Sequence, residues 1–174
     1  IPDRAGQVPE TDAVSVARYR AAGAIILGKT NVPFMSADLQ SYNEVYGVTN
    51  NPWNTERTSG GSSGGAAAAL AAGLSALEVG SDIGGSIRIP SHFNGVFGHK
   101  PSYGIVSQQG HIPPGQSILS ESDLSVVAPL GICADDIAQA LDILIGASPI
   151  EAKAWRVELP PARFDDPSEL RVAV

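Results

Sequence analysis

The sequence predicts an α/β layer fold, because stretches with helical spacing alternate with short apolar stretches that are typical of strands. Helices are expected over residues 9–22, 66–74 and 135–145, and strands over residues 24–27 and 75–79. A chain of 174 residues with 43% hydrophobic content can bury a core, and its length suggests one domain.

The first helix and strand follow from residues at the helix ends. Thr11 and Asp12 are good N-cap residues for a helix over residues 9–22, and Gly23 is typical of a helix end. The next four residues, Ala24 to Leu27, are all apolar. Because a short continuous apolar run is typical of a strand covered on both faces, we expect a buried strand there.

The second helix is expected in an alanine-rich run, residues 66–74, whose helix propensity is high. The stretch after it, residues 75–79, is short enough to be a strand. The third helix, residues 135–145, keeps apolar residues at helical spacing. Residues 30–59 and 105–123 show little periodicity and many loop-forming residues, so we expect both to be irregular segments.

Two loops rich in glycine and serine, residues 60–65 and 80–86, flank the second helix and the strand after it. Glycine reaches left-handed backbone angles cheaply, and paired glycines let successive N–H groups turn toward one point. Such an arrangement can hold an oxyanion. Ser86 ends the second loop and Ser62 lies in the first, so the sequence predicts a serine-nucleophile site that uses no histidine.

The second loop also contains candidate oxyanion donors. The N–H groups of Ile83, Gly84 and Gly85, together with that of Ser86, can converge on one carbonyl. Ser63 in the first loop is either a further hydrogen-bonding group of the site or an ordinary loop serine.

Asp82 and Arg88 stand on either side of these donors. Exposed charges of this kind are often plain surface residues. Beside a buried loop of this type, however, Asp82 is expected to pair with Arg88 or with backbone N–H groups and so hold the loop in shape. We therefore assign both residues a structural role.

Two other glycine-containing motifs, the phosphate-binding loop and the nucleophile elbow, do not match this sequence at particular residues. The segment 60–65 has the outer glycines of a phosphate-binding loop, but Ala66 and Ala67 stand where that loop needs lysine and then serine or threonine. The nucleophile elbow of α/β-hydrolases needs a glycine two residues after the serine, and Arg88 stands there after Ser86. Nucleotide binding and a Ser-His-Asp triad are therefore disfavoured.

No metal or cofactor is expected. His92, His99 and His111 show neither metal-ligand spacing nor a suitable carboxylate partner, so we interpret them as noncatalytic. Cys133 has no activating motif and is interpreted as a small buried hydrophobic residue.

Composition limits the partners and the compartment. A net charge of −7 argues against nonspecific binding to nucleic acid or to an acidic membrane surface. No run of about 18 apolar residues exists, so no membrane span is expected. A single cysteine allows no intrachain disulfide, which suits a cytoplasmic protein.

At this point the motifs resemble those of the amidase signature family. The residues GGSSGG at 60–65 and GSDIGGSIRIP at 80–90 follow the family's pattern. So do AGAIILGKTN at 22–31 and GVFGHKPSYG at 95–104. The resemblance covers roughly residues 10–146 and is closest between Ser59 and Gly104.

The resemblance implies a fold, a substrate and a set of roles. The fold is a mixed central β-sheet flanked by helices on both sides, and the substrate is a small-molecule amide. Ser86 would be the nucleophile that forms the acyl-enzyme. Ser62, preceded by a cis peptide bond, would relay the proton of Ser86. The family's third catalytic group is a lysine that acts as general base.

This lysine is not found in the sequence. Lys29, Lys100 and Lys153 are the only lysines, and each stands in another context; by the family's spacing the base should precede Ile1. The final residues, 170–174, resemble a strand cut off in mid-run.

We therefore expect residues 1–174 to be a partial amidase signature domain, an internal piece of a larger enzyme. The site-bearing portion is residues 59–104, and no second domain is expected. This chain alone should be inactive.

Three functions stay open. The first is an amidase that releases ammonia or an amine, and the second is the glutamine-hydrolysing subunit of an amidotransferase. The second is disfavoured because SDLSVVAPLG at residues 122–131 departs from that subunit's usual sequence. The third is an inactive scaffold fragment, whose unpaired sheet edges would favour a homodimer.

Phe34, Met35 and Tyr42 are either walls of a substrate pocket or, as we favour, ordinary packing residues.

Overall fold

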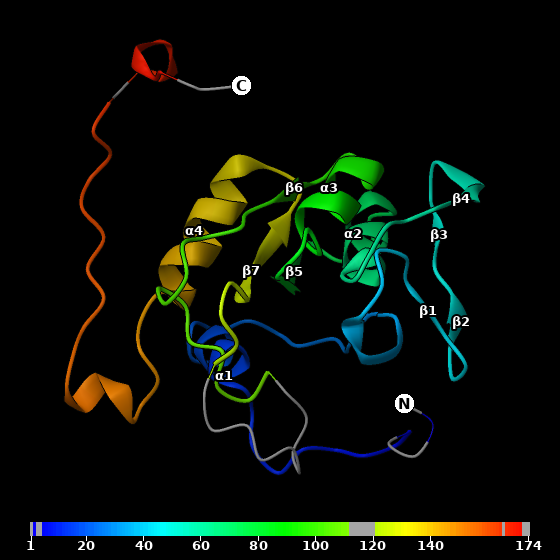
Figure 1. Ribbon diagram of the computed structural model, residues 1–174, viewed down its shortest axis with the longest axis horizontal. Coiled ribbons are helices and arrows are strands. Elements are labelled where there is room, and N and C mark those ends of the chain that lie inside the picture. Colours follow the sequence, from blue (N-terminus) through cyan, green and yellow to red (C-terminus); the bar gives the residue numbers. More distant parts are fainter. Residues whose placement is uncertain (1, 3–4, 112–120, 165, 172–174) are drawn as a thin grey trace.

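The structure is a computed structural model that describes residues 2, 5–111, 121–164 and 166–171 (Figure 1). Its helices and strands, in chain order, are α1 (Val14–Ala21), η2 (Phe34–Ser36), β1 (Tyr42–Asn43), β2 (Gly47–Val48), β3 (Asn50–Asn51), β4 (Asn54–Thr58), α2 (Gly64–Ala71), β5 (Leu77–Asp82), α3 (Arg88–Asn94), β6 (Phe97–Gly98), β7 (Val126–Gly131), α4 (Ala134–Leu144), η3 (Glu151–Lys153) and η4 (Pro167–Glu169).

The central sheet has the strand order β5-β7-β6, and both described pairings are antiparallel. Along β5 and β7 the register runs from Leu77 opposite Gly131 to Asp82 opposite Val126. The middle strand, β7, is buried along its whole length. The position of Asp82 in the sheet is therefore fixed by six consecutive residue pairs.

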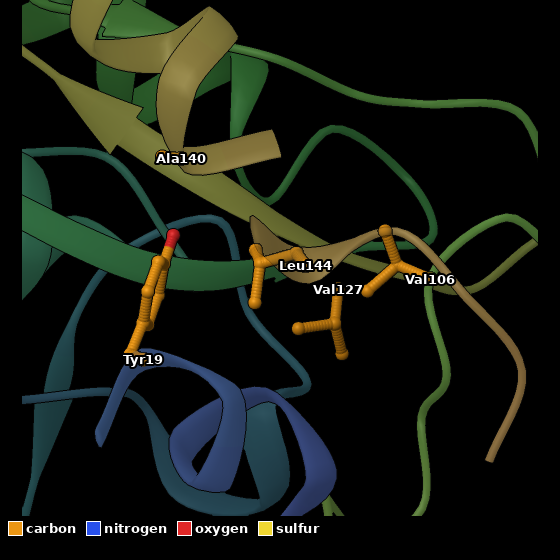
Figure 2. Packing of buried hydrophobic residues seen from close by; sticks show 5 residues of the cluster. All are labelled: Tyr19, Val106, Val127, Ala140 and Leu144. Carbon is orange, nitrogen blue, oxygen red and sulfur yellow. The ribbon is translucent and has the colours of Figure 1, made fainter. Parts of the chain in front are cut away.

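Helices cover both faces of β7, which confirms the predicted α/β layer fold. Successive side chains of a strand point to opposite faces, and here Val127 and Ala128 belong to different hydrophobic clusters. Figure 2 shows Val127 packed with Tyr19 of α1 and Leu144 of α4. On the other face, Ala128 packs with residues of α2 and with Ile87, which directly precedes α3. The full clusters are Tyr19, Val106, Val127, Ala140 and Leu144, and Ala67, Leu70, Ile87, Ala128 and Leu130.

Helix α2 is almost entirely buried, and small residues make this possible. It begins two residues earlier than predicted, at Gly64, and ends at Ala71. A Cβ atom at Gly65 would collide with the backbone of Asn31, and the N–H of Gly65 donates to the Asn31 carbonyl at 3.1 Å. The glycines that open α2 thus let the chain around Asn31 lie directly against the helix.

The first helix begins later than predicted. Helix α1 starts at Val14 after Ala13, which makes no side-chain cap, and the carboxylate of Asp12 instead pairs with Arg20 at 2.8 Å. The expectation that Thr11 or Asp12 caps the helix was therefore wrong. Asp12 pairs with a cation of the last turn of the same helix, so its side chain is not used at the helix start.

The expected strand at residues 24–27 is absent from the described part of the structure. Ile25 and Leu27 are 85% and 80% exposed. An apolar run indicates that a segment is suited to burial, but a strand also needs a neighbour to pair with, and none of the described residues supplies one.

The expectation that residues 30–59 are irregular needs correction. Residues 30–59 contain two small antiparallel sheets, β1-β2 and β3-β4. Part of the segment 105–123 and of the final stretch 170–174 lies outside the described residues.

The third predicted helix is confirmed as α4, with a boundary one residue earlier. Its N-cap is Cys133, whose sulfur accepts from the N–H of Asp136 at 3.4 Å. Cys133 is half-buried, and its sulfur caps the helix. The purely hydrophobic role assigned to it was therefore wrong. None of the described helices is long and apolar enough to cross a membrane.

The end of α4 is held by Arg18 of α1. Its half-buried guanidinium donates to the carbonyl of Leu144, the last residue of α4, and to the carbonyls of Gly146 and Ala147 just after it. The last carbonyls of a helix have no partner within the helix, so these bonds satisfy groups that would otherwise need water. Arg18 thereby fixes α1 against the sheet face that carries α4.

We predict that Arg18→Met in the complete gene product lowers the free energy of unfolding by about 1.5–3 kcal/mol, because charged hydrogen bonds to three carbonyls are lost. Urea unfolding measures the change. The control is Arg20→Ala, which removes only the exposed pair with Asp12 and should cost less than about 1 kcal/mol. Equal effects of the two substitutions would contradict the role of Arg18.

Candidate active site

The two glycine-serine loops occupy equivalent places in the fold. The first connects β4 to α2 and the second connects β5 to α3. Ser62 lies two residues before α2 and Ser86 two residues before α3. Both serines are buried, at 2% and 6% exposure.

A backbone hydrogen bond joins the two loops. The N–H of Ser63 donates to the carbonyl of Ser86 at 3.0 Å. The peptide bond between Gly61 and Ser62 is cis, as the family resemblance implies. The structure thus brings Ser62 and Ser86 to the same end of β5, each in a chain segment tied to the other.

The hydroxyls of Ser62 and Ser86 make no hydrogen bond within the described residues. The other polar groups near Ser62 are occupied. The hydroxyl of Ser41 donates to the Ser62 carbonyl at 3.1 Å and accepts from the N–H of Gly64 at 2.9 Å. Among the described residues, the Ser62 hydroxyl is therefore left without a partner. A hydroxyl can donate one hydrogen bond and accept another at the same time, which is the property that a proton relay needs.

Ser41 was missed by the sequence reasoning. It is 1% exposed and lies in a segment expected to be irregular. No motif marks it, because its role depends on a contact with a loop about 20 residues further along the chain, which only the folded structure reveals.

The second loop is built around the carboxylate of Asp82, which is fully buried. Its oxygens accept from the backbone N–H groups of Gly85, Ile87 and Arg88 at 2.9, 3.0 and 3.2 Å. The Arg88 guanidinium adds two bonds, from Nε at 3.1 Å and from Nη2 at 2.9 Å. Asp82 thus pairs with both of the expected partner types.

These bonds change the list of oxyanion donors. The N–H of Gly85 is directed at Asp82, so it is not free for a substrate in this structure, contrary to expectation. Within the described part of the chain, the N–H groups of Ile83, Gly84 and Ser86 make no hydrogen bond. Ile83 and Gly84 are exposed, so their N–H groups remain the candidates.

Ser63 faces the sheet. Its hydroxyl lies 3.4 Å from the N–H and 3.5 Å from the carbonyl of Ser81 in β5, and both contacts are long. Its backbone N–H binds Ser86. The structure therefore places Ser63 between the two loops, and a contact with substrate stays a prediction.

Phe34, Met35 and Tyr42 are not core residues, contrary to the interpretation we favoured. They are 58%, 51% and 47% exposed. Phe34 and Tyr42 line a hollow of about 430 Å³, and Tyr42 directly follows Ser41, which binds Ser62.

A protein-family model described as "Amidase" matches residues 2–174. The chain belongs to the amidase family.

Individual amidase-family proteins are similar over most of the chain. Fatty-acid amide hydrolase 2-A of Danio rerio is 44% identical over 158 residues, which are 90% of this chain and 29% of that protein. The glutamyl-tRNA(Gln) amidotransferase A subunit of Methanococcoides burtonii is 40% identical over 171 residues, 97% of this chain and 35% of that protein.

Solved amidase-family structures share the fold. The 6-aminohexanoate cyclic dimer hydrolase complexed with substrate matches with a TM-score of 0.78 and 35% identity, over 92% of this chain and 32% of that one. The glutamyl-tRNA(Gln) amidotransferase A subunit of Thermotoga maritima matches with a TM-score of 0.75 and 34% identity, over 85% and 31%. The chain therefore spans about a third of the length of these relatives and forms part of an amidase domain.

No lysine binds either serine among the described residues of this amidase-family chain. The Lys100 ammonium donates to the carbonyl of Pro101 at 3.3 Å. The described ranges also contain no group of three His, Cys, Asp or Glu side chains that could hold a metal ion.

Electrostatics keep Asp82 charged. Burial alone would raise the pKa of its carboxyl group, but hydrogen bonds from Arg88 and from the three backbone N–H groups outweigh burial and lower the pKa to about 2. The same interaction raises the pKa of Arg88. Hydrogen bonds to the ionised form thus stabilise both the loop and the charge.

We predict a pH-dependent contribution of Asp82 to stability. The pKa in the folded state lies below the ordinary value of 3.8, so the contribution is complete above about pH 4 and is lost as the pH falls toward 2. Its size is about 2 kcal/mol. Unfolding measured from pH 7 to pH 2 should therefore show a smaller acid-induced loss for Asp82→Asn than for the wild type.

The matched control is Asp12→Asn, which removes an exposed carboxylate from a surface ion pair. It should leave the pH dependence close to that of the wild type. Parallel curves for the wild type and Asp82→Asn would contradict the assignment.

Proposed function

We propose that the protein containing this chain is an amidase that cleaves a carboxylic amide through an acyl-enzyme on Ser86. The observation that carries the proposal is the pair of buried serines, Ser62 and Ser86, on loops joined by the bond from Ser63 to the Ser86 carbonyl. Proximity of this kind is what a relayed proton transfer requires.

In the proposed reaction the Ser86 hydroxyl attacks the amide carbon and passes its proton through Ser62 to a base. A lysine in another part of the polypeptide is the base that the resemblance implies. The N–H groups of Ile83 and Gly84 stabilise the oxyanion. The C–N bond then breaks, and ammonia or an amine leaves with the proton. Water cleaves the acyl-Ser86 ester and releases the acid.

Asp82 and Arg88 support this reaction without touching the substrate. Their hydrogen bonds hold the backbone from Gly85 to Arg88, which contains Ser86. Such preorganisation keeps donors and nucleophile in place at the moment of reaction.

A second candidate is the glutamine-hydrolysing subunit of an amidotransferase. Its support is the 40% identity to the glutamyl-tRNA(Gln) amidotransferase protein of Methanococcoides burtonii. The chemistry on Ser86 would be the same, and the substrate would be glutamine. Release of ammonia from glutamine, compared with hydrolysis of apolar amides, separates the two candidates.

We further infer that residues 1–174 lie within one domain, with the site-bearing portion at residues 59–104, and that the protein acts in the cytoplasm. The single cysteine, which allows no intrachain disulfide within these residues, supports the cytoplasmic location.

We predict that Ser86→Ala in the complete gene product lowers amide hydrolysis by more than about 1,000-fold, because the nucleophile is lost. It should also abolish labelling by a fluorophosphonate probe, as read from the intact mass. The control is Ser91→Ala in α3, a serine of similar burial whose hydroxyl has no partner among the described residues. Retained labelling of Ser86→Ala would rule out the assignment, and an unlabelled wild type would favour the inactive scaffold.

A further inference from the structure

Asn94, the last residue of α3, connects the two serine loops at a second point. Its side chain is fully buried, and its Nδ2 donates to the carbonyl of Ser59 at 2.7 Å and to that of Pro90 at 2.7 Å. Ser59 directly precedes the first loop, while Pro90 lies in the helix that follows Ser86. One amide group thus holds both segments.

The first loop also lies directly against α3. A Cβ atom added at Gly60 would lie 3.0 Å from the Cα of Pro90, and the φ of Gly60 is +77°. This backbone conformation and this spacing favour glycine. The contact leaves no room for another side chain between the loop and the helix.

Helix α3 is therefore tied to the first loop at both of its ends. Before its start, the Ser86 carbonyl accepts from Ser63, which follows Ser62. At its end, Asn94 donates to Ser59, which precedes Ser62 by three residues. A single hydrogen bond fixes one distance but leaves rotation about it, whereas two separated bonds also fix the orientation.

We propose that Asn94 is a positioning residue that sets the orientation of Ser62 relative to Ser86. It touches neither the substrate nor the reacting atoms, and it acts through the Ser59 carbonyl. This inference rests on the proposed function for its effect on rate, but its effect on the loop does not depend on that function.

Asn94→Ser in the complete gene product tests the bond across the loops. A serine hydroxyl can bind the carbonyl four residues earlier, here Pro90, but is too short to reach Ser59. We expect kcat and the rate of fluorophosphonate labelling at Ser86 to fall between about 10-fold and about 100-fold, with KM changed less than about twofold. Hydrogen exchange across residues 59–66 should become faster.

The matched control is Trp53→Phe. The Trp53 indole donates to the backbone carbonyl of Asn94 at 2.8 Å, so this variant removes a hydrogen bond to the same residue and leaves its side chain in place. Its kcat, labelling rate and loop exchange should equal those of the wild type.

The outcomes separate this inference from the proposed function. Labelling of Asn94→Ser and of Asn94→Ala at the wild-type rate would overturn the inference while the function stands. Loss of cooperative unfolding in both variants would also overturn it, because Asn94 would then be a core residue only. A wild type without labelling or amide hydrolysis would overturn the function, and faster loop exchange in Asn94→Ser would still support the loop-orienting role of Asn94.

Discussion

The site depends first on the buried carboxylate of Asp82. Five hydrogen bonds converge on it, three from backbone N–H groups and two from Arg88. A charge in this position without partners would be costly, and the loop supplies partners only when its backbone turns inward. The turn that carries Ser86 is thus the conformation that satisfies Asp82, and the register of β5 with β7 fixes where that turn begins.

Small residues allow the second loop to meet the first. Helix α2 packs against β5, β7 and α3 with glycine and alanine on its buried surface. Larger side chains there would hold the helix away from the sheet and separate Ser62 from Ser86. The alanines that raise helix propensity in this run therefore also help to set the distance between the loops. The residues that favour the helix locally are thus also those that allow its packing in the fold.

The sequence predicted the features that depend on local pattern. The boundaries of α4, the alanine-rich α2 and the two glycine-serine loops follow from residue type and spacing. The features that were missed depend on pairings in the folded chain that residue type and spacing do not mark. Asp12 pairs with Arg20 rather than capping α1, the run at residues 24–27 has no pairing strand in the described structure, and Gly85 directs its N–H at Asp82. Ser41 and Asn94 are single buried polar residues, which no periodicity marks.

The arrangement around Ser62 suits a relay more than a nucleophile. Its carbonyl is bound by Ser41, and the next N–H, that of Ser63, is bound by Ser86. The backbone on the C-terminal side of Ser62 is therefore held by the framework, and the rotatable hydroxyl is the polar group left to act. Ser86 differs, because it follows the exposed residues Ile83 and Gly84, whose N–H groups we propose as donors to a developing negative charge. In the mechanism that we propose, two serines of equal chemistry thus take different roles because of the backbone that surrounds them.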